Sequence, residues 1–198
     1  MVEMVKVFKS GYCKSLEGFS KKGGSYLKVI KFPALWCLVK HSKEGYILFD
    51  TGYSDYVLNC TGKFPERLYS LLLPIYLKKG ENAVDYLADL GIKPEEISYI
   101  IISHFHADHI GGLNYFKNCK FIYSNKAFNS IKDLSGISAV KKSFFKELIP
   151  ADFQERSIYI ENIKKTSDSI LYPFTECFDV FGDKSLLLVP LEGHAKGQ

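Results

Sequence analysis

Three of the chain's five histidines lie within one stretch of six residues, from His104 to His109. His104 and His106 are two positions apart, and Asp108 directly precedes the third imidazole, that of His109. Neutral imidazole is the commonest metal ligand near neutral pH, and zinc also accepts carboxylate oxygen. A helix-capping loop with solvated histidines does not explain this density, so the pattern predicts a metal site.

The spacing within this motif indicates how its ligands divide. Residues two apart point the same way at a strand end, so His104 and His106 are expected to grip one ion together. Asp108 and His109 follow the turn and point elsewhere, which suits a second ion. Paired ions about 3.5–4 Å apart let one bridging hydroxide attack while both ions stabilise the developing oxyanion.

The neighbouring elements place the motif where a strand ends. The apolar run 98–103 is typical of a strand buried on both faces, and open α/β sheets place their sites at such carboxyl ends. His194 follows another apolar run, 186–191, in a Gly-His-x-x-Gly loop, and is a further ligand candidate. Asp50 ends the expected strand 46–49. It is predicted to accept a hydrogen bond near the metal loop and to fix its histidines, with a plain strand-end turn as the alternative.

The rest of the chain is expected to alternate strands and helices. A hairpin of strands 34–40 and 45–50 is predicted, with Pro33 interrupting the strand before it and His41 an ordinary surface residue at the turn. The other expected strands cover 5–12, 25–31, 120–124, 157–160, 177–181 and 185–189. Helices are expected over 65–77 with a bend at Pro74, and over 81–90, 113–116, 126–134 and 141–148.

Composition narrows the class of protein. The 198 residues, 46% hydrophobic and 24% charged, suit one globular domain over 1–198. A net charge of +4 with very few arginines argues against a nucleic-acid partner. The five scattered cysteines without a CxxC favour a reducing compartment. No signal peptide or membrane-spanning run is visible, so a cytoplasmic protein with no membrane contact is expected.

With these motifs in place, the chain resembles the metallo-beta-lactamase-fold hydrolases. Three segments carry the resemblance in the family's order, namely 47–52, 101–112 and 191–198. The resemblance implies an α/β fold, an αβ/βα four-layer sandwich with two sheets inside and helices outside. It also implies a site with two zinc ions, for which manganese or iron are alternatives.

The resemblance also assigns roles to the candidate ligands. It implies that one ion is held by three histidines and the second by an aspartate and a histidine. The first set is His104, His106 and His194, and the second is Asp108 and His109. Asp108 is the implied catalytic residue, because it takes a proton from the bridging hydroxide or orients it. Asp50 is expected to hold these ligands by hydrogen bonds and not to bind the ions itself.

Within the family, segments 32–38 and 44–52 are similar to the N-acyl-homoserine lactonase branch. The expected function is therefore a zinc-dependent hydrolase that uses a metal-bound hydroxide to attack a small ester or lactone. The alternatives are a glyoxalase II-like thioesterase, a phosphodiesterase and a degenerate, non-catalytic metal-binding scaffold. Diiron flavoproteins of this fold are disfavoured, because they carry Glu where this chain has His106. The expected partner is a small-molecule substrate, and a homo-oligomer is left open.

The sequence departs from the family's pattern after the loop of His194. The family usually adds a bridging Asp and a last His further along, and this sequence ends at Gln198 before either. The expectation is thus a domain incomplete at its C-terminus, with a weak or single-metal site. An incomplete sheet would leave unpaired edges and apolar surface, which favour association.

Overall fold

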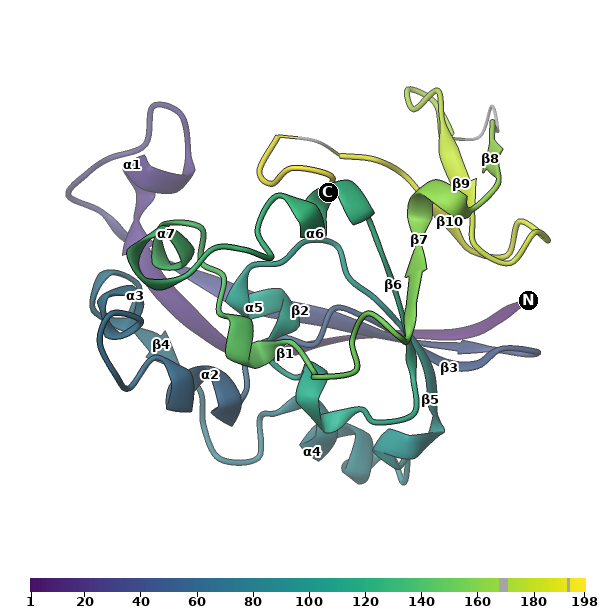
Figure 1. The fold of residues 1–198 in the computed structure, drawn as a ribbon, viewed down its shortest axis with the longest axis horizontal. Coiled ribbons are helices and arrows are strands. Elements are labelled where there is room, and N and C mark those ends of the chain that lie inside the picture. Colours follow the sequence, from purple (N-terminus) through teal and green to yellow (C-terminus); the bar gives the residue numbers. More distant parts are fainter. Residues whose placement is uncertain (168–170, 192) are drawn as a thin grey trace.

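The structure, a computed structural model, describes residues 1–167, 171–191 and 193–198. Its main element is a seven-stranded sheet in the order β4-β1-β2-β3-β5-β6-β7 (Figure 1). The strands are β1 (Val2–Leu16), β2 (Val29–His41), β3 (Gly45–Phe49), β4 (Ile75–Tyr76), β5 (Ile97–Ile101), β6 (Lys120–Tyr123) and β7 (Ser157–Tyr159). The pairs among β4, β1, β2 and β3 are antiparallel, and those from β3 to β7 are parallel.

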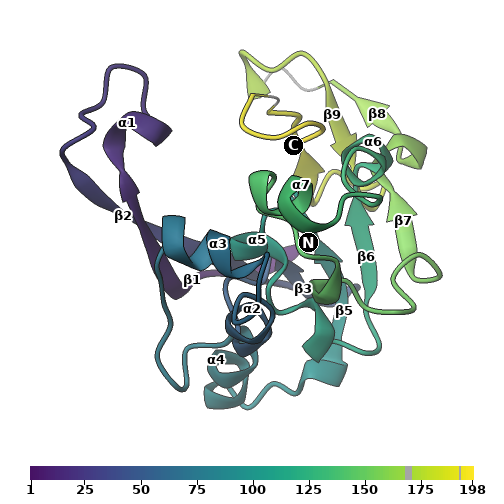
Figure 2. The ribbon, with the colours of Figure 1, turned by 60° about the vertical axis from the view of Figure 1, so that its left-hand side comes forward.

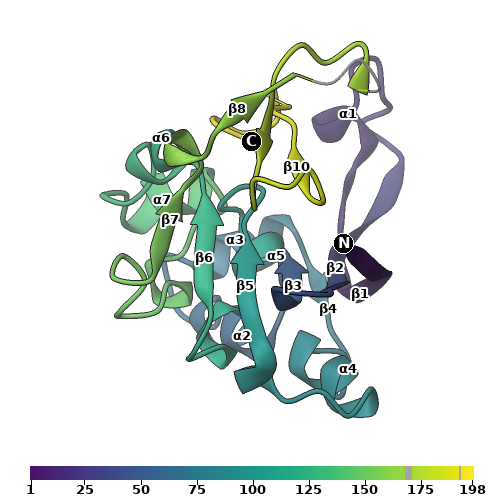
Figure 3. The ribbon, with the colours of Figure 1, turned by 90° about the vertical axis from the view of Figure 1, so that its right-hand side faces the viewer.

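A three-stranded antiparallel sheet in the order β10-β9-β8 forms a second layer, near the end of β7 (Figure 3). Its strands are β8 (Lys165–Thr166), β9 (Cys177–Asp179) and β10 (Leu187–Leu188). The helices are α1 (Glu17–Ser20), α2 (Asp55–Cys60), α3 (Arg67–Leu72), α4 (Ala83–Asp89), α5 (Ala107–Ile110), α6 (Asn125–Asn129) and α7 (Gly136–Lys141). Short 3-10 turns are η1 (Pro94–Glu96), η2 (Leu113–Tyr115), η3 (Lys146–Leu148) and η4 (Ile160–Asn162).

The two faces of the large sheet bury different partners, because successive strand residues point to opposite sides. On one face, side chains such as Leu48 and Ile100 pack in one core with residues of α2 to α7. On the other face, Ile47 and Ile101 pack against residues of the smaller sheet, including Leu188. The result is the mixed α/β arrangement expected from the sequence, with a helical layer, a large sheet and a second sheet.

The long hairpin of β1 and β2, with α1 near its tip, extends away from this core (Figure 2). Pro33 was expected to interrupt the strand, and that is wrong, because β2 runs straight through it. Pro33 lies opposite Tyr12, beside a register shift in β1 between Lys9 and Tyr12. Proline has no backbone N–H to donate to a neighbouring strand, and it is tolerated in a sheet at such an irregularity.

Several expected elements exist with other bounds. The strand expected over 25–31 begins only at Val29, and the helix over 65–77 is limited to Arg67–Leu72. The helix over 141–148 is replaced by the end of α7 and the turn η3. Residues 168–170, within the expected strand-rich stretch 157–189, and Glu192, within the segment 191–198, lie outside the described residues. Within the described part of the chain, none of the helices has the length and apolar character to cross a membrane.

Candidate metal centre

The site is built where β3 and β5 end side by side. These strands run parallel, so Asp50 and the loop after Ile101 emerge at the same edge of the sheet. The backbone N–H of Asp50 donates to the carbonyl oxygen of Ile101 at 2.8 Å. In the opposite direction, the backbone N–H of Ser103 donates to the side-chain oxygen Oδ1 of Asp50 at 2.8 Å. The motif loop therefore starts from a fixed position.

Asp50 adopts a backbone φ of 60°, a left-handed conformation that is strained for a residue with a Cβ. Hydrogen bonds of the next residue, Thr51, stabilise this strained conformation. The backbone N–H and the hydroxyl of Thr51 both donate to the carbonyl of His109, at 2.8 and 3.0 Å. The backbone N–H of Gly112 donates to Thr51 Oγ1 at 2.9 Å. These hydrogen bonds between residues 50–51 and the motif loop, called the brace below, turn the Asp50 carboxylate toward the histidines.

Two glycines after the motif allow this close contact. A Cβ on Gly111 would lie 2.5 Å from the carbonyl oxygen of Gly52, and one on Gly112 would lie 3.1 Å from Thr51 Cβ. The hydroxyl of Ser54 also donates to the carbonyl of Gly111. At these two positions, the absence of a Cβ lets the backbone pass close to residues 51 and 52.

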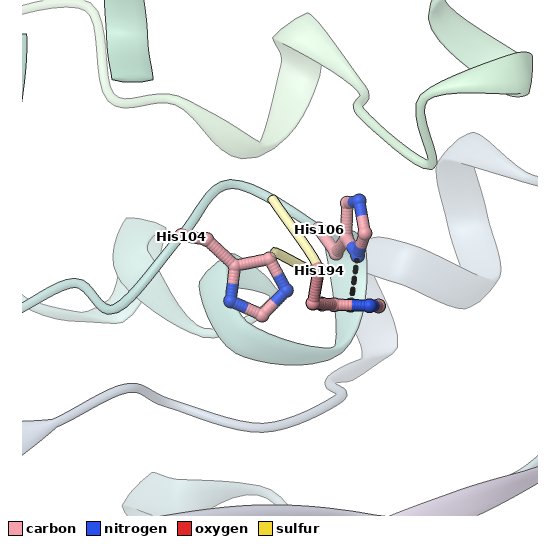
Figure 4. Close-up of side chains that lie close together, drawn as sticks. All are labelled: His104, His106 and His194. Carbon is pink, nitrogen blue, oxygen red and sulfur yellow. Dashed lines mark hydrogen bonds between the residues drawn. The ribbon is translucent and has the colours of Figure 1, made fainter. Parts of the chain in front are cut away.

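Three imidazoles meet in front of this edge, those of His104, His106 and His194 (Figure 4). One ring nitrogen from each lies within 4.8 Å of the others. His194 comes from residues 193–198, and its Nε2 lies 3.1 Å from His106 Nδ1. His104 is buried, and among the described residues its Nε2 has no hydrogen-bond partner. A buried imidazole nitrogen without a partner is costly unless a ligand satisfies it.

Ser103, which the sequence analysis did not single out, connects the histidines to Asp50. Its hydroxyl lies 2.7 Å from Asp50 Oδ2, 3.0 Å from His104 Nδ1 and 3.3 Å from His109 Nδ1. A carboxylate only accepts, so the hydroxyl donates to Asp50 and accepts from the N–H of His104 Nδ1. That tautomer leaves the lone pair of His104 on Nε2. The only available signal was the serine's position between the strand and the first histidine.

The imidazoles of His104 and His106 are neutral. Burial, together with the nearby imidazoles of His109 and His106, lowers the pKa of His104 to about 2. Burial also lowers the pKa of His106 to about 4, against the opposing charge of Asp108. Neutral imidazole is the form that binds metal ions.

Asp108 and His109 lie outside the group of three and contact each other. His109 Nε2 is 3.4 Å from Asp108 Oδ2, while His109 Nδ1 is 2.7 Å from Asp50 Oδ2. Burial opposes the charged form of His109, but its hydrogen bonds with Asp108 and Asp50 outweigh this and raise its pKa to about 10. Burial likewise opposes ionisation of Asp108, yet the hydrogen bond from His109 lowers its pKa to about 2.

The expectation that His41 is an ordinary surface residue is wrong. Its side chain is buried, and its Nδ1 accepts from the backbone N–H groups of Lys43 and Glu44 at 3.3 and 3.1 Å. Its Nε2 then donates to Ser185 Oγ at 2.9 Å, and its ring packs on Phe181. His41 therefore closes the β2–β3 turn and joins it to the connection between β9 and β10, at the opposite end of β3 from Asp50.

The fold and this histidine cluster define a mixed α/β protein with a candidate metal centre at a sheet edge. The sequence pattern of the Metallo-beta-lactamase superfamily matches residues 30–123, from β2 to β6. Over this part, just under half of its length, the chain is similar to the metallo-beta-lactamase superfamily.

Known lactonases are similar to part of the chain. An N-acyl homoserine lactonase of Bacillus thuringiensis is 30% identical over 103 residues, which are 52% of this chain and 41% of the lactonase. The N-acyl homoserine lactonase AttM of Rhizobium johnstonii is 25% identical over 170 residues, 84% of this chain and 58% of AttM. The chain thus matches between about two fifths and three fifths of the length of these relatives.

Solved structures share the fold. An N-acyl homoserine lactone hydrolase, with the product N-hexanoyl-L-homoserine bound at its catalytic metal centre, matches with a TM-score of 0.67 and 22% identity. The match covers 90% of this chain and 65% of that hydrolase. A probable metal-dependent hydrolase from Staphylococcus aureus matches with a TM-score of 0.62 and 17% identity, over 88% of this chain and 63% of that protein.

Proposed function

We propose that this chain is a single-domain, zinc-dependent hydrolase that acts on a small ester or lactone. The observation that carries the proposal is that three imidazoles from two distant segments lie together, and that the buried Nε2 of His104 has no hydrogen-bond partner among the described residues. This donor set fits zinc, which takes three protein ligands at catalytic sites and keeps a further position for water or substrate.

The ligands divide into two proposed sets. His104, His106 and His194 would hold one ion, and Asp108 and His109 a second. Asp50 supports the second set, because a metal-binding histidine usually donates its other ring nitrogen to a carboxylate, and His109 Nδ1 lies 2.7 Å from Asp50. Zinc bound there would polarise a carbonyl and lower the pKa of water to about 7.

The chain's own residues would then orient the reaction. Asp108, with its pKa lowered to about 2, stays ionised at neutral pH and can accept a proton from water. Ser103 and Asp50 keep the imidazoles of His104 and His109 from rotating, because each contacts a ring nitrogen. His104 is buried, so electrostatic interactions at its ring are stronger than they would be in water.

A ring ester is the proposed substrate class because the similar proteins with named activities are N-acyl homoserine lactonases. Hydrolysis of a lactone needs water attack on the ring carbonyl and a proton for the departing alkoxide. The proposed role of Asp108, as an acceptor and then a carrier of that proton, supplies both steps of the proton transfer.

Metal analysis and hydrolysis together test the proposal. The purified protein is loaded with zinc, its metal content is measured by mass spectrometry, and N-hexanoyl-homoserine lactone hydrolysis is followed by acid release. We expect bound zinc and lactone hydrolysis, with both lost in His106→Ala. His41→Ala also removes one imidazole, but outside the centre, so it should keep both while lowering stability. A protein that retains no zinc, or a His106→Ala variant with unchanged turnover, would contradict the proposal.

A further inference from the structure

The cavity beside the histidines is small, and two lysines are among the residues that line it. It has a volume of about 200 Å³, below the roughly 300–1,000 Å³ typical of pockets for drug-sized ligands. The three imidazoles line one side of it, and Phe105, Ala127 and Ile131 supply apolar surface. Among the described residues, which leave out 168–170 and 192, the other charged side chains that line it are those of Lys142 and Lys196, and none of these lining residues carries a carboxylate.

The two lysines come from separate parts of the fold. Lys142 directly follows α7, and Lys196 lies two residues after His194. In the described ranges, with their gaps at 168–170 and 192, neither forms an ion pair with a carboxylate. The cavity thus offers two available ammonium groups within reach of the imidazoles.

We infer that the substrate of the proposed hydrolase carries a carboxylate, joined by a short chain to the ester or lactone carbonyl, and that Lys142 and Lys196 bind this carboxylate. The inference rests on the proposed function for the reacting bond. The small volume limits the buried part of the substrate to a short group, and the unpaired ammonium groups favour a negative charge at its end. The apolar wall formed by Phe105 and Ile131 would contact the methylene groups between the two ends.

Two matched esters isolate the charge of the substrate. Mono(4-nitrophenyl) glutarate and its methyl ester differ only in a terminal carboxylate. We expect the zinc-loaded protein to show a kcat/KM about tenfold higher for the carboxylate ester, which is the scale of one or two partly exposed ion pairs. The ratio should shrink in 0.5 M NaCl, because salt screens such pairs. Equal kcat/KM values for the two esters would overturn the inference.

Lysine variants then locate the effect. Lys142→Met should reduce the ratio of the two kcat/KM values to about threefold or less, mainly through KM, and leave the methyl ester unaffected. Lys141→Met removes the neighbouring charge at the end of α7, which does not line the cavity, and should keep the full ratio. Combining Lys142→Met with Lys196→Met should abolish the preference. Equal losses on both esters in Lys142→Met would overturn the inference.

A binding experiment separates failure of this inference from failure of the proposed function. Glutarate binding to the metal-free protein is followed by ligand-observed NMR, with inorganic phosphate as a second probe. Glutarate binding that weakens in Lys142→Met and not in Lys141→Met supports the carboxylate site even if no ester is hydrolysed. Ester hydrolysis without any glutarate binding would overturn the inference but would leave the proposed hydrolase function standing. If phosphate binds more tightly than glutarate, with the same dependence on Lys142, the lysines form a phosphate site. That result would overturn the inference that they bind a carboxylate.

Discussion

The two segments that deliver the histidines are held in very different ways. In the loop 103–112, His104 is 2% exposed, and Asp50 and Thr51 fix the loop through side-chain and backbone hydrogen bonds. In the segment 193–198, the His194 side chain is exposed. That segment is held by the bond from Leu191 N–H to the carbonyl of Gln198, at 2.8 Å, and by packing on α6.

The packing on α6 depends on one glycine. Gly197 has a φ of 73°, and a Cβ there would lie 2.7 Å from Ser124 Oγ and 3.0 Å from Ala127 Cβ. The motif loop therefore forms together with the core of the fold, whereas the third histidine reaches the centre through a few local contacts. Changes in the loop should be costly for folding, and changes in the segment should mainly affect ligand binding.

Removing the carboxylate of Asp50 should break the loop most severely. Asp50→Ala removes the acceptor of Ser103 N–H and the nearer of the two carboxylates beside the positively charged His109, so we expect the free energy of unfolding to fall by about 3–5 kcal/mol. Asp50→Asn keeps an acceptor and tolerates the positive φ, so its loss should be smaller. Urea unfolding of the metal-free protein measures both. Losses below about 1 kcal/mol for both variants would mean that the brace is not what holds the loop.

A methyl group on Gly111 tests the close contact in the same brace. Gly111→Ala places a Cβ against backbone, at 2.5 Å from the carbonyl of Gly52, and backbone cannot rotate away. We expect a loss of about 2–3 kcal/mol, as for other overpacked sites. Gly62→Ala is the matched control, since its nearest contact is 3.3 Å away. A stable Gly111→Ala protein would show that residues 51 and 52 can move apart from the loop.

The sequence predicts those features of the motif loop and of the segment 193–198 that depend on residues close together in the chain. It predicts less well those that depend on residues far apart in the chain. The strand before the motif and the pairing of β2 with β3 follow from local apolar runs and a short turn, and both are present. Asp50 was expected to accept a hydrogen bond near the motif loop; the structure places its carboxylate 2.7 Å from His109 Nδ1, and its role beside a metal stays a prediction. The burial of His41 was not predictable, because Phe181 and Ser185 reach it from far along the chain.

Other details of the site were equally hidden in the sequence. Lys142 resembles the many surface lysines of this chain, and only the position of α7 brings it to the cavity. The strand expected over 185–189 shortens to Leu187–Leu188, since only two residue pairs with β9 form among the described residues. Local patterns thus predict the elements, whereas the pairing of distant segments decides their length and their role.

The loop should also give the metal-free protein a stability maximum near pH 6.5. His109, with its pKa raised to about 10 from about 6.5 when unfolded, stabilises the fold fully below pH 6.5 and loses this as pH rises toward 10. His104 and His106, with pKa values lowered to about 2 and about 4, resist protonation in the folded state. Below pH 6.5 the unfolded chain therefore takes up protons first, and stability falls.

Urea unfolding of chelator-treated protein at pH 4.5, 6.5 and 9.5 measures both limbs of this profile. We expect losses of about 1–2 kcal/mol on either side of the maximum. His109→Gln removes the group responsible for the alkaline limb, so that limb should flatten in the variant while the acid limb remains. A stability that is unchanged between pH 6.5 and 9.5 in the original protein would contradict the ion pairs assigned to His109.

The smallest effect on folding is expected at His194. The side chain is exposed and its neighbour is the ring of His106, so His194→Ala should change the free energy of unfolding of the metal-free protein by less than about 0.5 kcal/mol. His104→Ala removes a buried ring with a hydrogen bond to Ser103 and should cost about 1–3 kcal/mol. Both variants should weaken zinc binding by at least about tenfold, measured by competition with a chelating dye. Equal stability losses in the two variants would show that the segment 193–198 is as much a part of the folded core as the motif loop, because only then would removal of the exposed ring disturb the fold.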